Sequence, residues 1–338
     1  MVSTRWVDAT GAIDHRWYSS VTTNSTPPMI IKRRFDPVKV LRYVQAEMLL
    51  AAAAAVVTFL LHRWEPLVAL PFSIAATLGG ALAIFIGFRN NSAYGRWWEA
   101  RTLCGGIVNS TRVLARLIIT FTDSHVHQPN YDRARSEAFK REMVLKVIAW
   151  AHALRLHLRG QQQWPELAPL LPPADLDEVL RAHNRPNVLM QQVGRRIYQA
   201  MADGTLGGFD SFQMEGQMLA LANHQGGCER IKNTPLLRQY HYFTRLFLQV
   251  FIVLLPFCLV ADLERMGVCW AVVPVSLLIS FVFAVIGKVG EVNEDPFEGR
   301  ITDVPLNAIC NTIERDLREL LGDKELPAKL LPVDGYLD

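Results

Sequence analysis

The sequence has few cysteines and no recognisable catalytic motif. Its five cysteines stand far apart in 338 residues, without a CxxC pair or the spacing of a zinc site. Neither a disulfide framework nor a metal knuckle is therefore expected. No GxSxG, Walker loop, HExxH or GxGxxG in a strand-to-helix context occurs, and these are the patterns that carry common chemistry. We predict that the chain is not an enzyme and needs no cofactor.

The sequence also has no excess of charge of either sign. The 35 basic residues nearly balance the 32 acidic ones, and without a basic patch or binding motif no nucleic acid partner is expected. Residues Met1 to Pro28 are polar and turn-rich, and no apolar core precedes a small-residue cleavage site. We therefore expect no secretory signal peptide in this segment. Any insertion into a membrane must use internal segments.

Apolar residues are abundant, and they gather in four long stretches. These run from about Val40 to Leu61, Leu67 to Phe88, Leu246 to Ala261 and Trp270 to Ile286. Each approaches the roughly 20 apolar residues that cross a bilayer as a helix. One such stretch could be a buried helix of a soluble protein. Four of them, paired by short links, predict an integral membrane protein whose partner is the lipid bilayer.

The basic residues predict the orientation of these spans. The link within the first pair holds only Arg63, and the link within the second pair holds only Arg265. Cytoplasmic flanks of membrane helices carry the excess of lysine and arginine. The opposite flanks hold that excess here, in Lys32, Arg33, Arg34, Lys39, Arg89, Arg96, Arg101, Arg245 and Lys288. We expect both termini and the long middle region in the cytoplasm.

The middle region reads as helical throughout. Its apolar residues recur at helical spacing, which predicts an extension of the second span over 89–120 and further helices near 136–159, 175–182, 187–202 and 208–225. We therefore expect an all-α membrane protein with four transmembrane helices continuous with a cytosolic bundle. The expected parts are an N-terminal cytosolic segment (1–30), transmembrane helices (31–88), a cytosolic helical region (89–242), transmembrane helices (243–288) and a C-terminal cytosolic segment (289–338).

Three short blocks carry a family resemblance. They are IFIGFRNNSAYGRWWEAR from Ile84 to Arg101, GGCERIKNTP from Gly226 to Pro235, and EDPF from Glu294 to Phe297. In sequence and order these blocks resemble the bestrophin family, and its bacterial branch closely. The agreement extends from about Ile31 to Leu306. The resemblance implies a pentameric ion channel in a bacterial inner membrane, with the second helix of each subunit lining the pore.

The resemblance also implies a hydrophobic neck made by three residues one helical turn apart. By position these are Gly80, Ile84 and Phe88, and such a spacing places them nearly in line on a helix. A ring of apolar side chains can gate ions by dewetting. Gly80 departs from the bulky residue usual in the family, so either the neck is wider there or the register differs slightly. The alternative is that Ile84 and Phe88 pack between neighbouring helices.

Two further positions follow from the resemblance. Arg89, Asn90 and Asn91 would make the pore polar just below the neck, where Arg89 would attract anions or extend to lipid headgroups. A second narrowing at the cytosolic exit matches Leu206, in a glycine-rich turn that could present one apolar side chain to the axis. The alternative for Leu206 is an ordinary loop leucine.

A calcium switch of the animal type is not expected. Animal members bind calcium through an acidic run, and Arg300 interrupts the matching run here. Calcium requires six to eight oxygen ligands, several of them carboxylates. The remaining acids could form only a weaker site, and they are Glu294, Asp295, Glu298 and Asp303.

The resemblance predicts the pore-forming subunit of a homopentamer that passes small monovalent ions. Chloride is the family's default ion, and cation selectivity stays open because the neck carries no charge. A secondary transporter is one alternative, although that class shows inverted repeats and the two halves of this chain show no internal similarity. A non-conducting membrane scaffold is the other.

Overall fold

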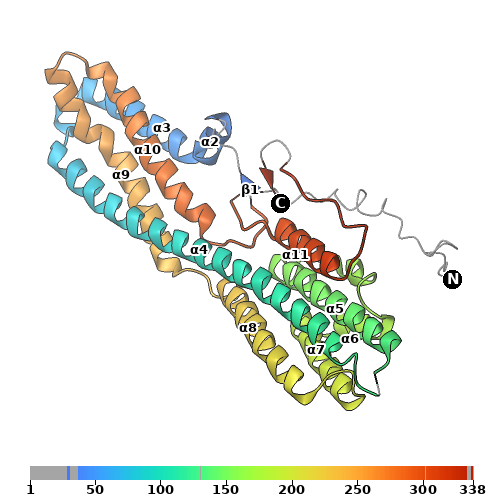
Figure 1. The fold of residues 1–338 in the computed structure, drawn as a ribbon. Helices are drawn as coiled ribbons and strands as arrows, with labels where there is room; N and C mark the ends of the chain where they lie inside the picture. The colour runs from blue at the N-terminus through green and yellow to red at the C-terminus, as the bar shows by residue number, and fades with distance from the viewer. Residues whose placement is uncertain (1–28, 31–36, 130, 301, 333–335, 338) are drawn as a thin grey trace.

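A computed structural model describes residues 29–30, 37–129, 131–300, 302–332 and 336–337. The predicted N-terminal segment, 1–30, lies outside the described residues except for its last two. The described chain is elongated, with one group of helices at one end and a second helical bundle at the other (Figure 1). Helix α4 (Phe72–Ser124) runs through both groups without a break. The fold is therefore two helical regions built around one shared helix.

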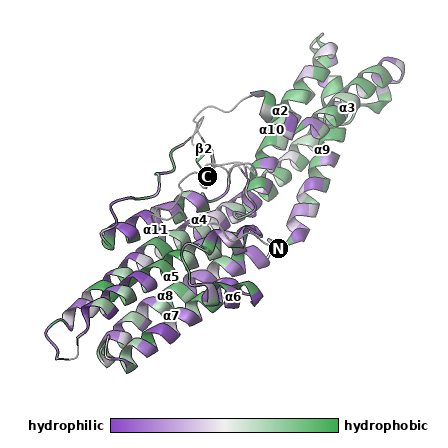
Figure 2. Cartoon of the chain, turned by 90° about the vertical axis from the view of Figure 1, so that its right-hand side faces the viewer, coloured by the Kyte–Doolittle hydropathy of each residue, from purple (hydrophilic) through white to green (hydrophobic). Residues whose placement is uncertain are grey.

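The first group contains the four helices that are long and apolar enough to cross a membrane. They are α3 (Gln45–Trp64), the first part of α4, α9 (Arg238–Arg265) and α10 (Val272–Asn293). Figure 2 shows apolar residues concentrated over this end of the molecule. Large apolar side chains such as Leu49 and Leu278 point outward, which suits contact with lipid. The predicted four-span membrane region is confirmed.

The starts of these helices differ in detail from the prediction. The short helix α2 (Pro37–Tyr43) precedes α3. The second span was expected to begin at Leu67, but a single 3₁₀ turn, η1 (Pro66–Val68), comes first and α4 begins only at Phe72. Pro71 occupies the position before the first helical residue. A proline disfavours helical backbone in the residue before it, so the α-helix starts after the second proline rather than after the first.

Small residues allow close packing of the membrane helices. Ala51 and Ala55 of α3 and Ser276 and Ser280 of α10 are fully buried, and these two helices pack on each other. Small side chains let helix backbones approach where lipid provides no hydrophobic drive for association. The membrane region therefore depends on close contact between its helices.

The second group is the predicted cytosolic bundle. Helix α5 (Arg133–Arg159) begins at Asp132, whose carboxylate accepts hydrogen bonds from two backbone N–H groups, and ends at Gly160, whose φ is 63°. The remaining helices of this group are α6 (Pro173–Arg181), α7 (Arg185–Ala202), α8 (Gly208–Asn233) and α11 (Leu306–Leu320), with the short 3₁₀ turn η2 (Trp164–Leu167). A further 3₁₀ turn, η3 (Cys269–Ala271), lies in the first group and links α9 to α10.

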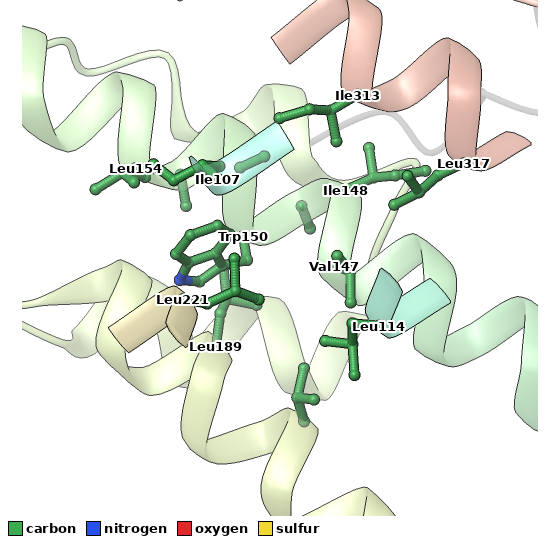
Figure 3. Close-up of a cluster of buried hydrophobic side chains, with 14 of the residues drawn as sticks. Ile107, Leu114, Val147, Ile148, Trp150, Leu154, Leu189, Leu221, Ile313 and Leu317 are labelled. Atoms are coloured by element: carbon green, nitrogen blue, oxygen red, sulfur yellow. The ribbon is translucent and has the colours of Figure 1, made fainter. Parts of the chain in front are cut away.

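The bundle has a continuous apolar core. Figure 3 shows Trp150 of α5 at its centre, between residues of α4, α7 and α8, with Ile313 and Leu317 of α11 on the other side of α5. The indole Nε1 of Trp150 donates to Gln225 of α8 at 3.1 Å, so its polar atom is paired. Helix α11 was not among the predicted helices. Two-residue strands β1 (Met29–Ile30) and β2 (Tyr336–Leu337) pair antiparallel, and the described chain is otherwise helical or irregular.

A candidate ion pathway along helix α4

Helix α4 keeps one face buried along its whole length. Most buried positions recur in steps of three or four residues, with one step of seven, through the membrane region and the bundle: Ala75, Gly79, Leu82, Ile86, Arg89, Ala93, Ala100, Cys104, Ile107, Thr111, Leu114, Ile118 and Thr122. This spacing matches the 3.6 residues of a helical turn. The helix therefore presents a single side to its own subunit over all 53 residues.

The opposite side of α4 stays uncovered, and we call it the open face. It consists of exposed residues in steps of three, four or seven: Gly80, Ile84, Phe88, Asn91, Gly95, Trp98, Thr102, Asn109, Arg116 and Thr120. Helices α8, α9 and α10 pack on the buried side. A surface this long and free of subunit contacts is where a pathway beside α4 would run.

The three residues expected at the neck all lie on the open face. Ile84 is 60% exposed and Phe88 is 66% exposed, so neither packs between helices of its own subunit. A side chain added at Gly80 would meet no atom within 4 Å. Two large apolar side chains thus project from neighbouring turns of α4, with open space one turn above them.

Arg89 does not continue this face. It follows Phe88 by one residue, which turns its side chain by about 100° around the helix axis. The side chain is 4% exposed, and Nη2 lies 2.7 Å from Nδ1 of His241 and donates to Glu294 Oε2 at 3.1 Å. The expected role of Arg89 at the pore exit or at lipid headgroups differs from this arrangement, because its guanidinium pairs inside the subunit.

Asn90 also turns away from the open face, whereas Asn91 lies on it. The amide of Asn90 donates to the carbonyl of Ile286 on α10 at 2.8 Å. The two helices are so close here that a Cβ atom on Gly290 would lie 2.0 Å from Asn90 Oδ1. Of the three polar residues expected below the neck, Asn91 alone shares the exposed face of Phe88.

The three sequence blocks meet at the point where the membrane helices enter the bundle. The guanidinium of Arg96, in the first block, donates to the carbonyls of Ile231 and Thr234 in the second block at 2.8 and 2.7 Å. Its Nε donates to the carbonyl of Glu294 in the third block at 2.9 Å. One side chain thus binds the ends of α8 and α10 to α4. The role of Arg96 is structural.

Neighbouring residues strengthen this junction. Trp97 donates its indole N–H to the carbonyl of Thr302 at 2.8 Å, and Glu99 pairs with Arg230 of α8. Trp98 instead lies on the open face, where its ring stacks on Tyr94 with centroids 6.4 Å apart. The RWWE sequence therefore places an arginine, one tryptophan and the acid on subunit contacts and leaves the other tryptophan exposed.

The four acids considered for a metal site do not converge in the described residues. Glu294 pairs with Arg89, Asp295 lies 3.7 Å from Arg96, and Glu298 pairs with Lys232 at 2.7 Å. Asp303 is buried and accepts from the backbone N–H of Arg300 at 3.0 Å. Burial raises the pKa of the Asp303 carboxyl to about 6. Glu294, Asp295 and Glu298 thus have basic partners, and Asp303 is buried. None of these carboxylates is arranged to bind calcium.

Leu206 does not project from the cytosolic turn, contrary to the expectation. It is 3% exposed, and its N–H donates to the carbonyl of Ala200 at 2.9 Å, which folds the turn back onto α7. The exposed apolar side chains near this turn include Phe209 and Phe212, at 75% and 72%. The sequence-based expectation did not include these two residues. Two phenylalanines three residues apart in an otherwise polar helix start were the available signal.

A hydrogen bond holds this end of the bundle in place. His125, at the end of α4, lies with Nε2 2.7 Å from Asp210 Oδ2 near the start of α8. The same carboxylate oxygen accepts from the N–H of Gly207 at 2.8 Å. The exposed Phe209 and Phe212 on either side of Asp210 are thereby fixed relative to the far end of α4.

These features define an integral membrane protein with four membrane helices, a cytosolic bundle and one helix that joins the two with an uncovered face. The chain belongs to the bestrophin family, because residues 31–319 match the family model described as "Bacterial/Fungal Bestrophin protein". The family resemblance of the three sequence blocks is confirmed.

Individual relatives agree over most of the chain. The voltage-dependent anion channel-forming protein YneE of Escherichia coli K12 is 33% identical over 300 residues, which cover 88% of this chain and 93% of that protein. A similarly named protein of Ralstonia nicotianae is 32% identical over 256 residues, which cover 76% and 78%. A crystal structure of a bacterial bestrophin homolog from Klebsiella pneumoniae superimposes with a TM-score of 0.75 at 30% identity, covering 83% of this chain and 100% of that one.

Proposed function

We propose that this chain is the pore-forming subunit of a homopentameric channel for small monovalent anions, with chloride as the default ion. The observation that carries the proposal is the exposure of Ile84 and Phe88 on the face of α4 opposite its buried face. Relatives named anion channel-forming proteins support it. We place the channel in the bacterial plasma membrane with both termini in the cytoplasm.

The gate in this proposal is the apolar ring made by Ile84 and Phe88 from five subunits. Such a ring blocks ions without any charge, because a narrow apolar constriction loses its water and an ion cannot cross it dehydrated. Gly80, one turn above Ile84, has no side chain to extend the ring. The constriction therefore has two layers, one of Ile84 and one of Phe88. Asn91, one turn below Phe88 on the open face, supplies the first polar group that a passing ion would meet.

The second narrowing is assigned to the start of α8. Phe209 and Phe212 are the large apolar side chains exposed there, whereas Leu206 belongs to the core. The bond between His125 and Asp210 fixes this segment to α4. Any cytosolic constriction would therefore be formed by phenylalanines held at a set distance from the pore helix.

The test is a bilayer recording on the purified protein under a salt gradient, together with its mass in detergent. A pentamer whose reversal potential follows the chloride gradient is the expected result. A stable monomer or dimer would end the pore proposal. A saturating, non-electrogenic flux would indicate a transporter instead, and a closed assembly that conducts nothing would indicate a scaffold.

A further inference from the structure

The open face of α4 continues far beyond the neck into the cytosolic bundle, and its charges there are unevenly distributed. Arg116 lies 32 residues after Ile84, which is about 48 Å along the helix axis and about 40° around it. Its side chain is exposed. Thr120, one turn further on, donates its hydroxyl to the backbone carbonyl of Arg116, a contact that leaves the guanidinium itself unused.

The charged neighbours on this side of α4 have ionic partners. Arg112, one turn before, donates from Nε to Asp316 of α11 at 2.8 Å. Asp123, two turns after, pairs with Lys140 of α5. Arg116 itself takes part in no ion pair or side-chain hydrogen bond within the described residues. On this stretch of the open face Arg116 is therefore a charged side chain with no partner among the described residues.

An unpaired arginine beside an ion pathway acts on the ions that enter it. In a pentamer five copies would surround one axis and set a positive potential at the cytosolic mouth. Low-dielectric walls focus such a field, and the local concentration of counter-ions rises with it. Guanidinium groups stay charged at all physiological pH values. The neck carries no charge and cannot distinguish anions from cations by electrostatics. Selection by charge must therefore occur elsewhere along the open face.

We infer that Arg116 is a specificity-determining residue that favours anions at the cytosolic mouth of the pathway. The inference rests on the proposed function, because it requires that ions pass along the open face. It adds selection by charge, which the uncharged neck cannot provide. Arg116 acts through its field at a distance, so a lysine can replace it but a neutral or acidic side chain cannot.

The experiment measures reversal potentials of reconstituted channels in a tenfold KCl gradient, at low and at high total salt. Arg116→Glu is expected to lower the chloride-to-potassium permeability ratio at least about threefold at low salt, with Arg116→Gln intermediate and Arg116→Lys like the parent. The difference should shrink at high salt, because the Debye length falls to about 3 Å at 1 M. A residue that only supported folding would not produce this salt dependence.

Arg181→Glu is the matched control, since it makes the same charge change at an exposed arginine on α6, which packs on α7. It should leave the ratio unchanged. Arg116→Glu channels that remain pentameric and keep the parental ratio at low salt would overturn the inference while leaving the channel intact. A parent protein that conducts nothing would instead overturn the proposed function.

Discussion

The buried face and the open face of α4 differ in the contacts that their residues make. On the buried face even the charged residues have partners: Arg89 pairs with Glu294, and residues of all three sequence blocks meet around Arg96. On the open face large apolar side chains and an arginine have none. The comparison teaches that exposure, and not residue type, separates the residues that hold the subunit together from those available to ions.

The largest effect on folding is expected for a substitution of Arg96. Arg96→Ala would remove hydrogen bonds to three backbone carbonyls at the ends of α8 and α10. Bonds from a charged donor are worth about 1.5–3 kcal/mol each. We expect little folded protein by size-exclusion chromatography. Lysine should not rescue it, because one ammonium cannot reproduce the guanidinium fork.

A control for this variant is Arg195→Ala. Arg195 forms an exposed pair with Glu178, and pairs of that kind contribute at most about 1 kcal/mol. Its elution profile and melting temperature should resemble those of the parent. If Arg96→Ala folded as well as Arg195→Ala, the meeting of the three blocks would not be what holds the junction.

A substitution at Phe88, on the open face, should leave the protein folded and change the current instead. Phe88→Ala would shrink and partly wet the apolar ring without changing any charge, so current through an intact pentamer should rise. Ile84→Ala should follow, and a bulky residue at Gly80 should reduce the current. The measurement is single-channel current with oligomer mass as a control.

Two other outcomes would count against this assignment of Phe88. A loss of assembly would correspond to the cost of about 3–5 kcal/mol that a core phenylalanine carries, and it would place Phe88 in a packed interface. An intact pentamer with parental current would remove Phe88 from the gate. Both outcomes can be told apart from a leakier channel in a single preparation.

A smaller effect is expected in the loop packed against the buried face. The pKa of Asp303 is raised to about 6 by burial, from an ordinary value of 3.8. The folded state then binds the proton more tightly than the unfolded chain does. Stability should fall as pH rises from about 4 through 6, by about 2 kcal/mol from this group. Melting in detergent at pH 5 and pH 7.5 measures it, and Asp303→Asn should flatten the difference.

The smallest expected effect is that of calcium, which should not change the current. Arg89, Arg96 and Lys232 lie beside Glu294, Asp295 and Glu298, so the carboxylates are already compensated. Recordings with a chelator and with micromolar calcium should agree. Currents that vanish with chelator and return with calcium would show that these acids are accessible to a divalent ion.

The sequence predicted the parts of this fold that depend on long, regular patterns. Four apolar stretches gave the membrane helices, and uninterrupted periodicity from 89 to 120 gave the continuation of α4. Helix α11 carries the same kind of pattern in Leu306, Cys310, Ile313 and Leu317, and it was overlooked. Its buried residues match helical spacing, so the sequence was sufficient to predict this helix.

The side on which a single residue lies was harder to predict. The direction of Arg89 depends on Glu294 and His241, which are distant in the sequence. The rotation of about 100° per residue nevertheless indicates that Arg89 cannot share a face with Phe88. Leu206 is different, because a turn packed on α7 decides its burial. No local pattern around 203–208 contains that information.

The unbroken course of α4 limits the motions by which such a channel could open. The helix contains no proline between Phe72 and Ser124, and it stays continuous through its glycine pairs at 79–80 and 105–106, so one common cause of a helix kink is missing. Tilting a stiff rod by about 5° displaces a point about 48 Å away by about 4 Å. A push on the cytosolic bundle would therefore act as a lever on the membrane portion, and opening would be a rotation or tilt of whole rods.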